Sequence, residues 1–308
     1  MGRYILRRFA FSVAALWVIV TLTFLLMHSI PGDPFMGEKV TEAIRLNMLR
    51  KYGLDKPLWQ QYLVYIGNLL RGDLGISLRM TNRTVNDLIR EGFPVSCVLG
   101  LEALAFAVTT GLCLGTLAGL KHNSGWDYLA IVVAIIGISV PNFITASILQ
   151  YVVGYRLRLL PIARWGTFEQ SIIPAFSLGL GTLAITARMM RTSILDVINQ
   201  DYIRTAKAKG LSEAEITWRH TLRNAILPIV TIMGPLIAGI TTGSLLIEQI
   251  FGIPGLGKYY VQSVYNRDYT LILGTTVFYA TILVVMNFLV DVSYGFIDPR
   301  IRLLKGRE

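Results

Sequence analysis

The stretch YLAIVVAIIGISVPNFITASILQYVVGY, residues 128–155, decides the fold class because its 28 residues include no charged side chain. A helix rises about 1.5 Å per residue, so a stretch of this length exceeds the roughly 30 Å thickness of the hydrocarbon core of a bilayer. Pro141 lies near its middle. The stretch therefore predicts one membrane span that contains a proline.

Five further apolar segments are long enough to be spans, and they cover residues 9–30, 95–120, 171–187, 225–247 and 269–290. Only 16% of the 308 residues are charged, against about 25% in soluble domains. The mean hydropathy of +0.55 also argues against a disordered chain. We expect an all-α, polytopic integral membrane protein with six transmembrane helices.

Basic residues orient this predicted protein in the membrane. The blocks 1–8, 121–127, 188–224 and 291–308 hold 15 of the 29 Lys and Arg residues, whereas the opposite short loops 156–170 and 248–268 hold 5. The positive-inside rule places the first four blocks, and hence both termini, in the cytoplasm. The net charge of +10 is then a sign of membrane topology, and we expect no nucleic-acid partner.

The segment between the first two predicted spans, residues 31–93, is large enough to have a role of its own. Apolar residues recur at helical spacing in 41–52 and again in 58–69, which predicts a helical insertion on the outer side. Packing as a cap on the outer ends of the spans is as plausible as a functional role. We divide the chain into residues 1–30, with the N-terminus and first span, the extracytoplasmic insertion 31–93, and the transmembrane core 94–308.

The cytoplasmic loop 188–224 has the pattern of two short helices joined by a glycine turn. Ala, Lys and Arg in 201–209 favour a helix, and Gly210 is a suitable stop. Ser212 with Glu215 forms a capping-box pattern that starts the second helix. The pattern suits docking against another protein, and equally a basic segment lying on anionic lipid.

Nucleotide and metal sites are not expected in this chain. Residues 252–258 fit the G-x-x-x-x-G-K pattern of a phosphate loop, but Tyr259 replaces the Ser or Thr that holds Mg²⁺. The three histidines, His28, His122 and His220, are scattered along the chain. We therefore expect no cofactor and no metal.

Two polar residues inside predicted spans are candidates for other roles. Ser139 would be the nucleophile if the chain were an intramembrane hydrolase, but no histidine lies within a span interior to activate it. Glu102 is the charged residue of the second span, which makes it a functional candidate by default. It lies only about 10 Å from the outer boundary, so we favour a structural role for it.

Small and polar residues near the helix-breaking prolines suggest a translocation path. Gly111, Gly115 and Gly119 form one face suited to close helix packing, and Gly239 with Gly243 forms another. Prolines free backbone groups that only protein or a water-lined cavity satisfies. The polar candidates for lining such a cavity are Ser139, Asn142, Thr145, Thr241, Thr242 and Ser244. Ordinary helix packing, or a stand-alone channel, would use the same residues.

The order of several short motifs resembles the permease subunits of binding-protein-dependent ABC importers, in the branch for oligopeptides, dipeptides and nickel. The motifs are PGDP at 31–34, YGLDKPL at 52–58, GDLG at 72–75, RTAKAKGL at 204–211, IE at 247–248, FGIPGLG at 251–257 and NRDY at 266–269. Within that branch the sequence is most similar to the B-type permeases of oligopeptide importers. The resemblance extends over nearly the whole chain.

The resemblance implies a transport subunit without enzymatic activity of its own. Its partners would be a second homologous permease, two cytoplasmic ATPases that bind ATP and Mg²⁺, and an extracytoplasmic substrate-binding protein, in a bacterial inner membrane. The ATPase-coupling motif would fall on Arg204, Thr205, Ala206, Lys207, Ala208, Lys209, Gly210 and Leu211. Arg204 and Thr205 depart from the family's usual glutamate and alanine, whereas Ala206 and Gly210 match. The implied substrate is a peptide, with nickel or another small solute as the alternative.

Overall fold

The computed structural model of the chain describes residues 2–29, 50, 53–80 and 82–297. These residues form helices and one isolated antiparallel bridge, between Ile76 and Thr84. Four helices are long and apolar enough to cross a membrane: α1 (Gly2–Ser29), α4 (Val85–Leu120), α7 (Phe168–Ile198) and α14 (Tyr269–Ile297). The prediction of an all-helical, polytopic membrane protein is confirmed.

Two further spans are bent pairs of helices, which bring the number of spans to six if each pair counts as one. In the first pair, α5 (Gly125–Ser139) is followed by α6 (Asn142–Leu149) and the π-helix η1 (Gln150–Arg156), at an angle of 104°. In the second, a short helical run meets α11 (Leu227–Thr241) at 47°. That run consists of α9 (Glu213–Glu215), the π-helix η2 (Ile216–Leu222) and α10 (Arg223–Ala225).

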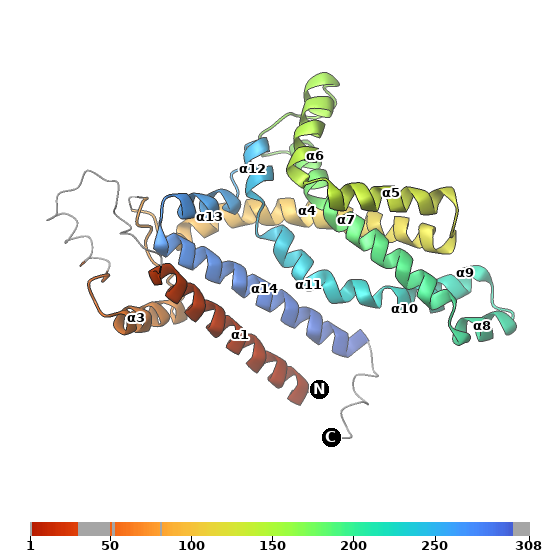
Figure 1. Ribbon diagram of the computed structural model, residues 1–308, viewed down its shortest axis with the longest axis horizontal. Helices are drawn as coiled ribbons and strands as arrows, with labels where there is room; N and C mark the ends of the chain where they lie inside the picture. Colours follow the sequence, from red (N-terminus) through yellow and green to blue (C-terminus); the bar gives the residue numbers. More distant parts are fainter. Residues whose placement is uncertain (1, 30–49, 51–52, 81, 298–308) are drawn as a thin grey trace.

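The bend after α5 corrects the expectation of a single continuous helix over 128–155. Val140 has extended backbone angles, φ −93° and ψ 119°, and Pro141 starts the next helix. Proline disfavours a helical conformation in the residue before it and lacks the N–H that a continuous helix needs. The arm formed by α6 and η1 therefore projects away from the helix bundle (Figure 1).

The fifth predicted segment, 225–247, also ends earlier than expected. Helix α11 stops at Thr241, and a new helix, α12 (Leu245–Phe251), begins after Gly243, whose φ of +102° is accessible mainly to glycine. By contrast, the segment 171–187 is part of a longer helix, because α7 continues to Ile198 and so enters the loop 188–224.

Helices α4 and α7 form the centre of the bundle, and glycines set how closely they approach. A Cβ atom on Gly115 would lie 2.5 Å from the carbonyl oxygen of Ala187, and one on Gly119 would lie 2.7 Å from Ile194. The predicted packing face on 111, 115 and 119 is confirmed. The second predicted face is not continuous, because α11 ends at Thr241 before Gly243, and no described residue of the chain lies within 4 Å of a Cβ on Gly239.

The described part of the predicted insertion packs on the C-terminal end of α1. Helix α3 (Leu58–Leu70) confirms the helix predicted over 58–69. Tyr62 Oη lies 2.7 Å from Thr21 Oγ1, and Gln61 Oε1 lies 3.0 Å from His28 Nε2. The predicted helix over 41–52 lies almost wholly outside the described residues.

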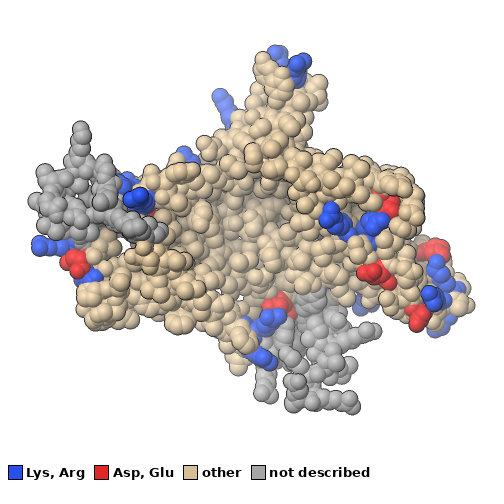
Figure 2. All heavy atoms as spheres, viewed as in Figure 1, with Lys and Arg blue, Asp and Glu red and all other residues tan. Residues whose placement is uncertain are grey.

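Charged side chains leave a broad uncharged area in the middle of the molecular surface seen in Figure 2. Large apolar residues in the spans are exposed there and elsewhere, for example Trp17 at 58% and Leu26 at 63%. Contiguous exposed apolar surface of this kind is typical of contact with lipid or with other membrane helices. In Figure 1 the loop between α7 and α11 lies at one end of the bundle, and α3 lies at the other.

Candidate coupling site and translocation path

The loop 188–224 has the helix–turn–helix form that its sequence predicts. Helix α8 (Asp201–Ala208) follows α7 after a gap of two residues. Gly210 takes the left-handed conformation, with φ +79°, which lets the chain reverse at that point. Ser212 Oγ then accepts a hydrogen bond from the backbone N–H of Glu215, at 3.3 Å, and caps the next helix.

Helix α8 has one buried face, which rests on the same chain. Ile203 and Ala206 are 1% and 5% exposed, and they form an apolar cluster with Ile216 of η2. Leu211 packs against the edge of this cluster. The cluster fixes the position of α8 relative to η2.

The burial of Ala206 changes its expected role. Of the two alanines in the expected coupling motif, Ala206 is buried and only Ala208 is exposed to a partner. The exposed coupling residues are Arg204, Thr205, Lys207, Ala208, Lys209 and Gly210. Exposed Tyr202, which precedes the expected motif, belongs to the same helix.

The charges on α8 are partly neutralised within the chain. Lys207 Nζ lies 3.1 Å from Glu213 Oε1, and Arg204 lies 3.6 Å from Asp201. Lys209 has no ion-pair partner among the described residues. These exposed pairs are worth little energetically, so Arg204 and Lys207 remain able to exchange their partners for acidic groups on another protein.

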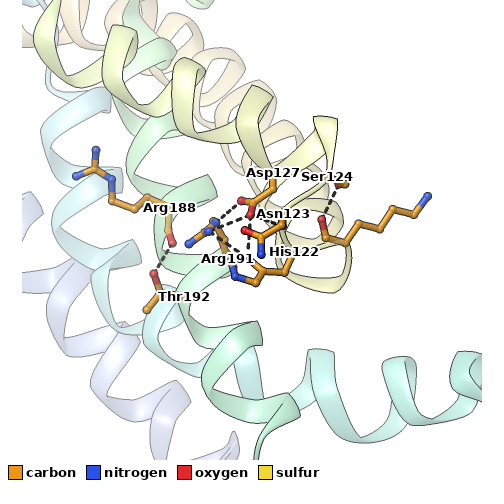
Figure 3. Close-up of polar contacts among 8 residues, drawn as sticks. His122, Asn123, Ser124, Asp127, Arg188, Arg191 and Thr192 are labelled. Atoms are coloured by element: carbon orange, nitrogen blue, oxygen red, sulfur yellow. Dashed lines mark hydrogen bonds and ion pairs between the residues drawn. The ribbon is translucent and has the colours of Figure 1, made fainter.

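A largely buried ion pair fixes the C-terminal part of α7 to the first turn of α5 (Figure 3). Arg191 of α7 donates from Nε to Asp127 Oδ1 and from its terminal nitrogen to Oδ2, the second at 3.0 Å. His122 Nδ1 and the backbone N–H of Asn123 each lie 2.9 Å from the same Oδ2. The Asp127 side chain is only 3% exposed. Arg191 of α7 therefore binds both carboxylate oxygens, and the connection between α4 and α5 supplies two further partners to Oδ2.

Sequence reasoning did not find this ion pair, because Asp127 and Arg191 are 64 residues apart in the chain. A single acidic residue at the start of an otherwise uncharged span was the available signal. The pair links α5 to α7, and α8 follows α7 after two residues.

The predicted translocation-path residues lie at two helix breaks, one between α5 and α6 and the other between α11 and α12. Ser139, Asn142 and Thr145 surround the bend between α5 and α6. Thr241, Thr242 and Ser244 surround the break between α11 and α12. The two interruptions are neighbours, since α12 packs against α6.

The hydroxyl groups of these candidates are not equally available. Thr241 Oγ1 donates to Ile237 O at 2.6 Å, and Thr242 Oγ1 donates to Ala238 O at 2.8 Å, so both bond to their own helix. Ser139 and Asn142 are exposed on the described chain.

Glu102, the acidic residue of α4 that was a further functional candidate, is half-buried, and its Oε2 has no hydrogen-bond partner among the described residues.

Comparison with known proteins identifies the family. The family described as "Binding-protein-dependent transport system inner membrane component" matches residues 111–303, and the N-terminal component of the same transport systems matches residues 1–99. This chain belongs to that family of transport permeases. The resemblance predicted from the sequence motifs is confirmed.

Individual relatives of this permease match over their full length. It is 48% identical to the dipeptide transport system permease protein DppB of Bacillus subtilis, over 99% of each chain. It is 42% identical to the oligopeptide transport system permease protein OppB of Haemophilus influenzae, over 98% of this chain and 100% of the relative. A solved amino acid ABC transporter chain matches at 16% identity with a TM-score of 0.54, covering 68% of this chain and 93% of that one, which supports the fold alone.

Proposed function

We propose that this permease is one of two transmembrane subunits of an ATP-driven importer of peptides. The observation that carries the proposal is the full-length similarity to permeases named for dipeptides and oligopeptides. The other half of the path is a second homologous permease. Two cytoplasmic ATPases bind ATP and Mg²⁺, and an extracytoplasmic binding protein delivers the peptide. This chain itself catalyses no reaction.

The exposed face of α8 is the proposed docking surface for one ATPase subunit. Its residues Arg204, Lys207 and Lys209 suit an acidic groove, and Gly210 allows the sharp reversal that projects the helix. When the two ATPases close on ATP, α8 moves as a rigid body with α7. The Arg191–Asp127 pair carries α5 along. These motions bias the path between inward-facing and outward-facing states.

The proposed setting is a bacterial inner membrane with both termini in the cytoplasm. Arg8 of α1 lies 2.8 Å from Asp291 of α14, so the start of the first span and the end of the last are at the same end of the bundle. The excess of basic residues in the inner blocks gives that end its cytoplasmic assignment.

Uptake by the reconstituted complex separates the candidate functions. The tagged chain is expressed with its neighbouring genes, purified with its partners and placed in proteoliposomes that contain Mg-ATP. ATP-dependent uptake of a labelled dipeptide, presented with the binding protein, is expected. Nickel uptake without peptide uptake would favour the small-solute alternative, and conductance by the chain without its ATPases would favour a channel.

The intramembrane hydrolase is the candidate from another class, and Ser139 tests it. Ser139 lies exposed at the last position of α5. The isolated chain is expected to leave the dipeptide intact over hours, as measured by mass spectrometry. Peptide cleavage that disappears in Ser139→Ala would contradict the proposal.

A further inference from the structure

The segment that follows α11 contains a buried glutamate with no assigned role. Helix α12 is joined to α13 (Leu256–Tyr265) by a short turn. Glu248, in the middle of α12, is 1% exposed and is among the most deeply buried side chains of the described chain. Such a group requires an explanation, because an unpaired buried carboxylate is costly.

The carboxylate of Glu248 joins three helices. Ser96 of α4 donates its hydroxyl proton to Oε1 at 2.6 Å, and the backbone N–H of Gly257 in α13 donates to Oε2 at 3.0 Å. Ser96 Oγ in turn accepts from the backbone N–H of Leu256, at 2.8 Å. Glu248 and Ser96 together therefore satisfy two N–H groups in the first turn of α13, where a negative group is favoured.

Three glycines make room for this carboxylate. A Cβ atom on Gly255 would lie 2.4 Å from the Glu248 carboxyl carbon, and one on Gly243 would lie 2.7 Å from Oε1. A Cβ on Gly257 would lie 3.0 Å from Oε2. Gly255 has a φ of −91°, which any residue adopts, so glycine is needed there for space and not for backbone conformation.

Helix α12 also contacts the arm formed by α6 and η1 and the loop that follows this arm. The side chain of Gln150 donates to Ile250 O in α12 at 2.9 Å, and the backbone N–H of Arg164 donates to Phe251 O at 2.8 Å. Phe251 is fully buried in the core cluster that includes Leu99 of α4. Helix α12 is thus the point where α4, the α6–η1 arm and α13 meet, at the end of α11 remote from α8.

We propose that Glu248 is a positioning residue of the transport cycle, which holds the α12–α13 segment against α4 and so keeps the outer end of the path closed at rest. The inference rests on the proposed function, because it needs two states of one path. A contact made in only one of two states favours that state, and its loss shifts the population toward the other. Loosening the segment therefore favours the outward-open state, in which the ATPases are closed and hydrolyse ATP.

ATP hydrolysis with and without the loaded binding protein tests the role of Glu248. In the purified complex, Glu248→Gln replaces an acceptor oxygen with an NH₂ group that faces N–H and O–H donors. We expect the basal hydrolysis rate per assembled complex to rise at least three-fold, and stimulation by the binding protein to fall correspondingly. Glu169→Gln is the matched control, since Glu169 is exposed in the first turn of α7 on the same side. It should leave both rates unchanged.

A second variant tests the contact without removing the carboxylate. Gly255→Ala places a methyl group against the carboxylate and should reproduce the raised basal rate. In a Glu248→Ala background the space is free, so Gly255→Ala should add nothing, a coupling that a double-mutant cycle measures. Ser96→Ala provides a third way to break the contact if Glu248→Gln assembles poorly.

The result that overturns the inference is a basal rate per assembled complex that is unchanged or lowered in both Glu248→Gln and Gly255→Ala. A purely structural role would reduce the amount of complex and leave the ratio of stimulated to basal rate as in the wild type. The wild-type complex separates the two proposals. If it fails to import peptide, the proposed function is wrong, whereas normal import with unaltered ratios in the variants removes only the role of Glu248.

Discussion

Arg191 and Asp127, which are 64 residues apart in the sequence, form a bidentate ion pair, in which one guanidinium binds both oxygens of a buried carboxylate. The contact joins the helix that leads to α8 with the helix that bends at Pro141. The contact therefore links the loop 188–224, through α7, to α5.

Removing one partner of this pair should destabilise the chain. Asp127→Ala leaves the partly buried Arg191 guanidinium without its acceptor, which typically costs about 1–3 kcal/mol. We expect the melting temperature of the purified complex to fall by several degrees. Arg188→Ala, three residues away on the same helix, removes an exposed side chain and should change the melting temperature by less than 1 °C (Figure 3). An equal fall in both variants would contradict the assignment.

The glycine face of α4 gives a second test with a matched substitution. Gly115→Ala places a methyl group 2.5 Å from Ala187 O, and forcing the two helices apart should cost about 1–3 kcal/mol. Gly239→Ala meets no described residue of the chain within 4 Å and improves helix propensity in α11, so it should be neutral or stabilising by up to about 1 kcal/mol. Thermal unfolding of the two purified variants measures the difference, and a stable Gly115→Ala protein would show that α4 and α7 do not pack as described.

Charge reversal on α8 tests the docking surface. Lys209→Glu introduces repulsion toward an acidic groove, and we expect roughly ten-fold weaker association with the ATPase subunits, less at high salt. Lys121 is exposed in the connection between α4 and α5, and Lys121→Glu should leave association unchanged. Titration of labelled ATPase at 50 mM and 500 mM salt measures the effect. An equal loss of affinity in both variants would show that the overall charge of the chain, and not α8, attracts the ATPase. Unchanged affinity in both variants would show that α8 is not part of the interface.

Ala206 should behave differently from the exposed residues of α8. Ala206→Leu adds volume inside the cluster with Ile203 and Ile216, so it should displace α8 on the chain itself. We expect ATPase subunits to bind but uptake to fall at least five-fold. Ala208→Leu changes the exposed face and should weaken ATPase binding first. Comparing bound ATPase with uptake in the two variants distinguishes the internal contact from the docking contact.

Local patterns in the sequence were sufficient for the helical class, the packing face on Gly115 and its neighbours, and the helix–turn–helix around Gly210. In each case spacing within a few turns determines the geometry. The bend at Pro141 was not predicted, because an apolar stretch of 28 residues has the same composition whether it forms one helix or two. The position of Pro141 indicated where the helix could be interrupted, but it did not indicate the angle between the two halves.

Contacts between distant residues were beyond the sequence patterns. Asp127 and Arg191 meet only because α5 and α7 are packed side by side, and Ser96 meets Glu248 across 152 residues. Glu248 was visible only as part of a motif, with no indication that Gly243, Gly255 and Gly257 surround its carboxylate. Ala206 is buried because η2 packs against that face of α8. The helical spacing of residues within α8 does not show which face η2 covers.

Uptake of an intact labelled dipeptide by proteoliposomes tests the central claim most directly. The complete complex, with its binding protein outside and Mg-ATP inside, should accumulate the unchanged dipeptide above the external concentration. Complexes that lack this chain, or that contain a non-hydrolysable ATP analogue, should not. Equilibration without accumulation in the presence of ATP would contradict the account, because it would describe a passive channel instead of an ATP-driven importer.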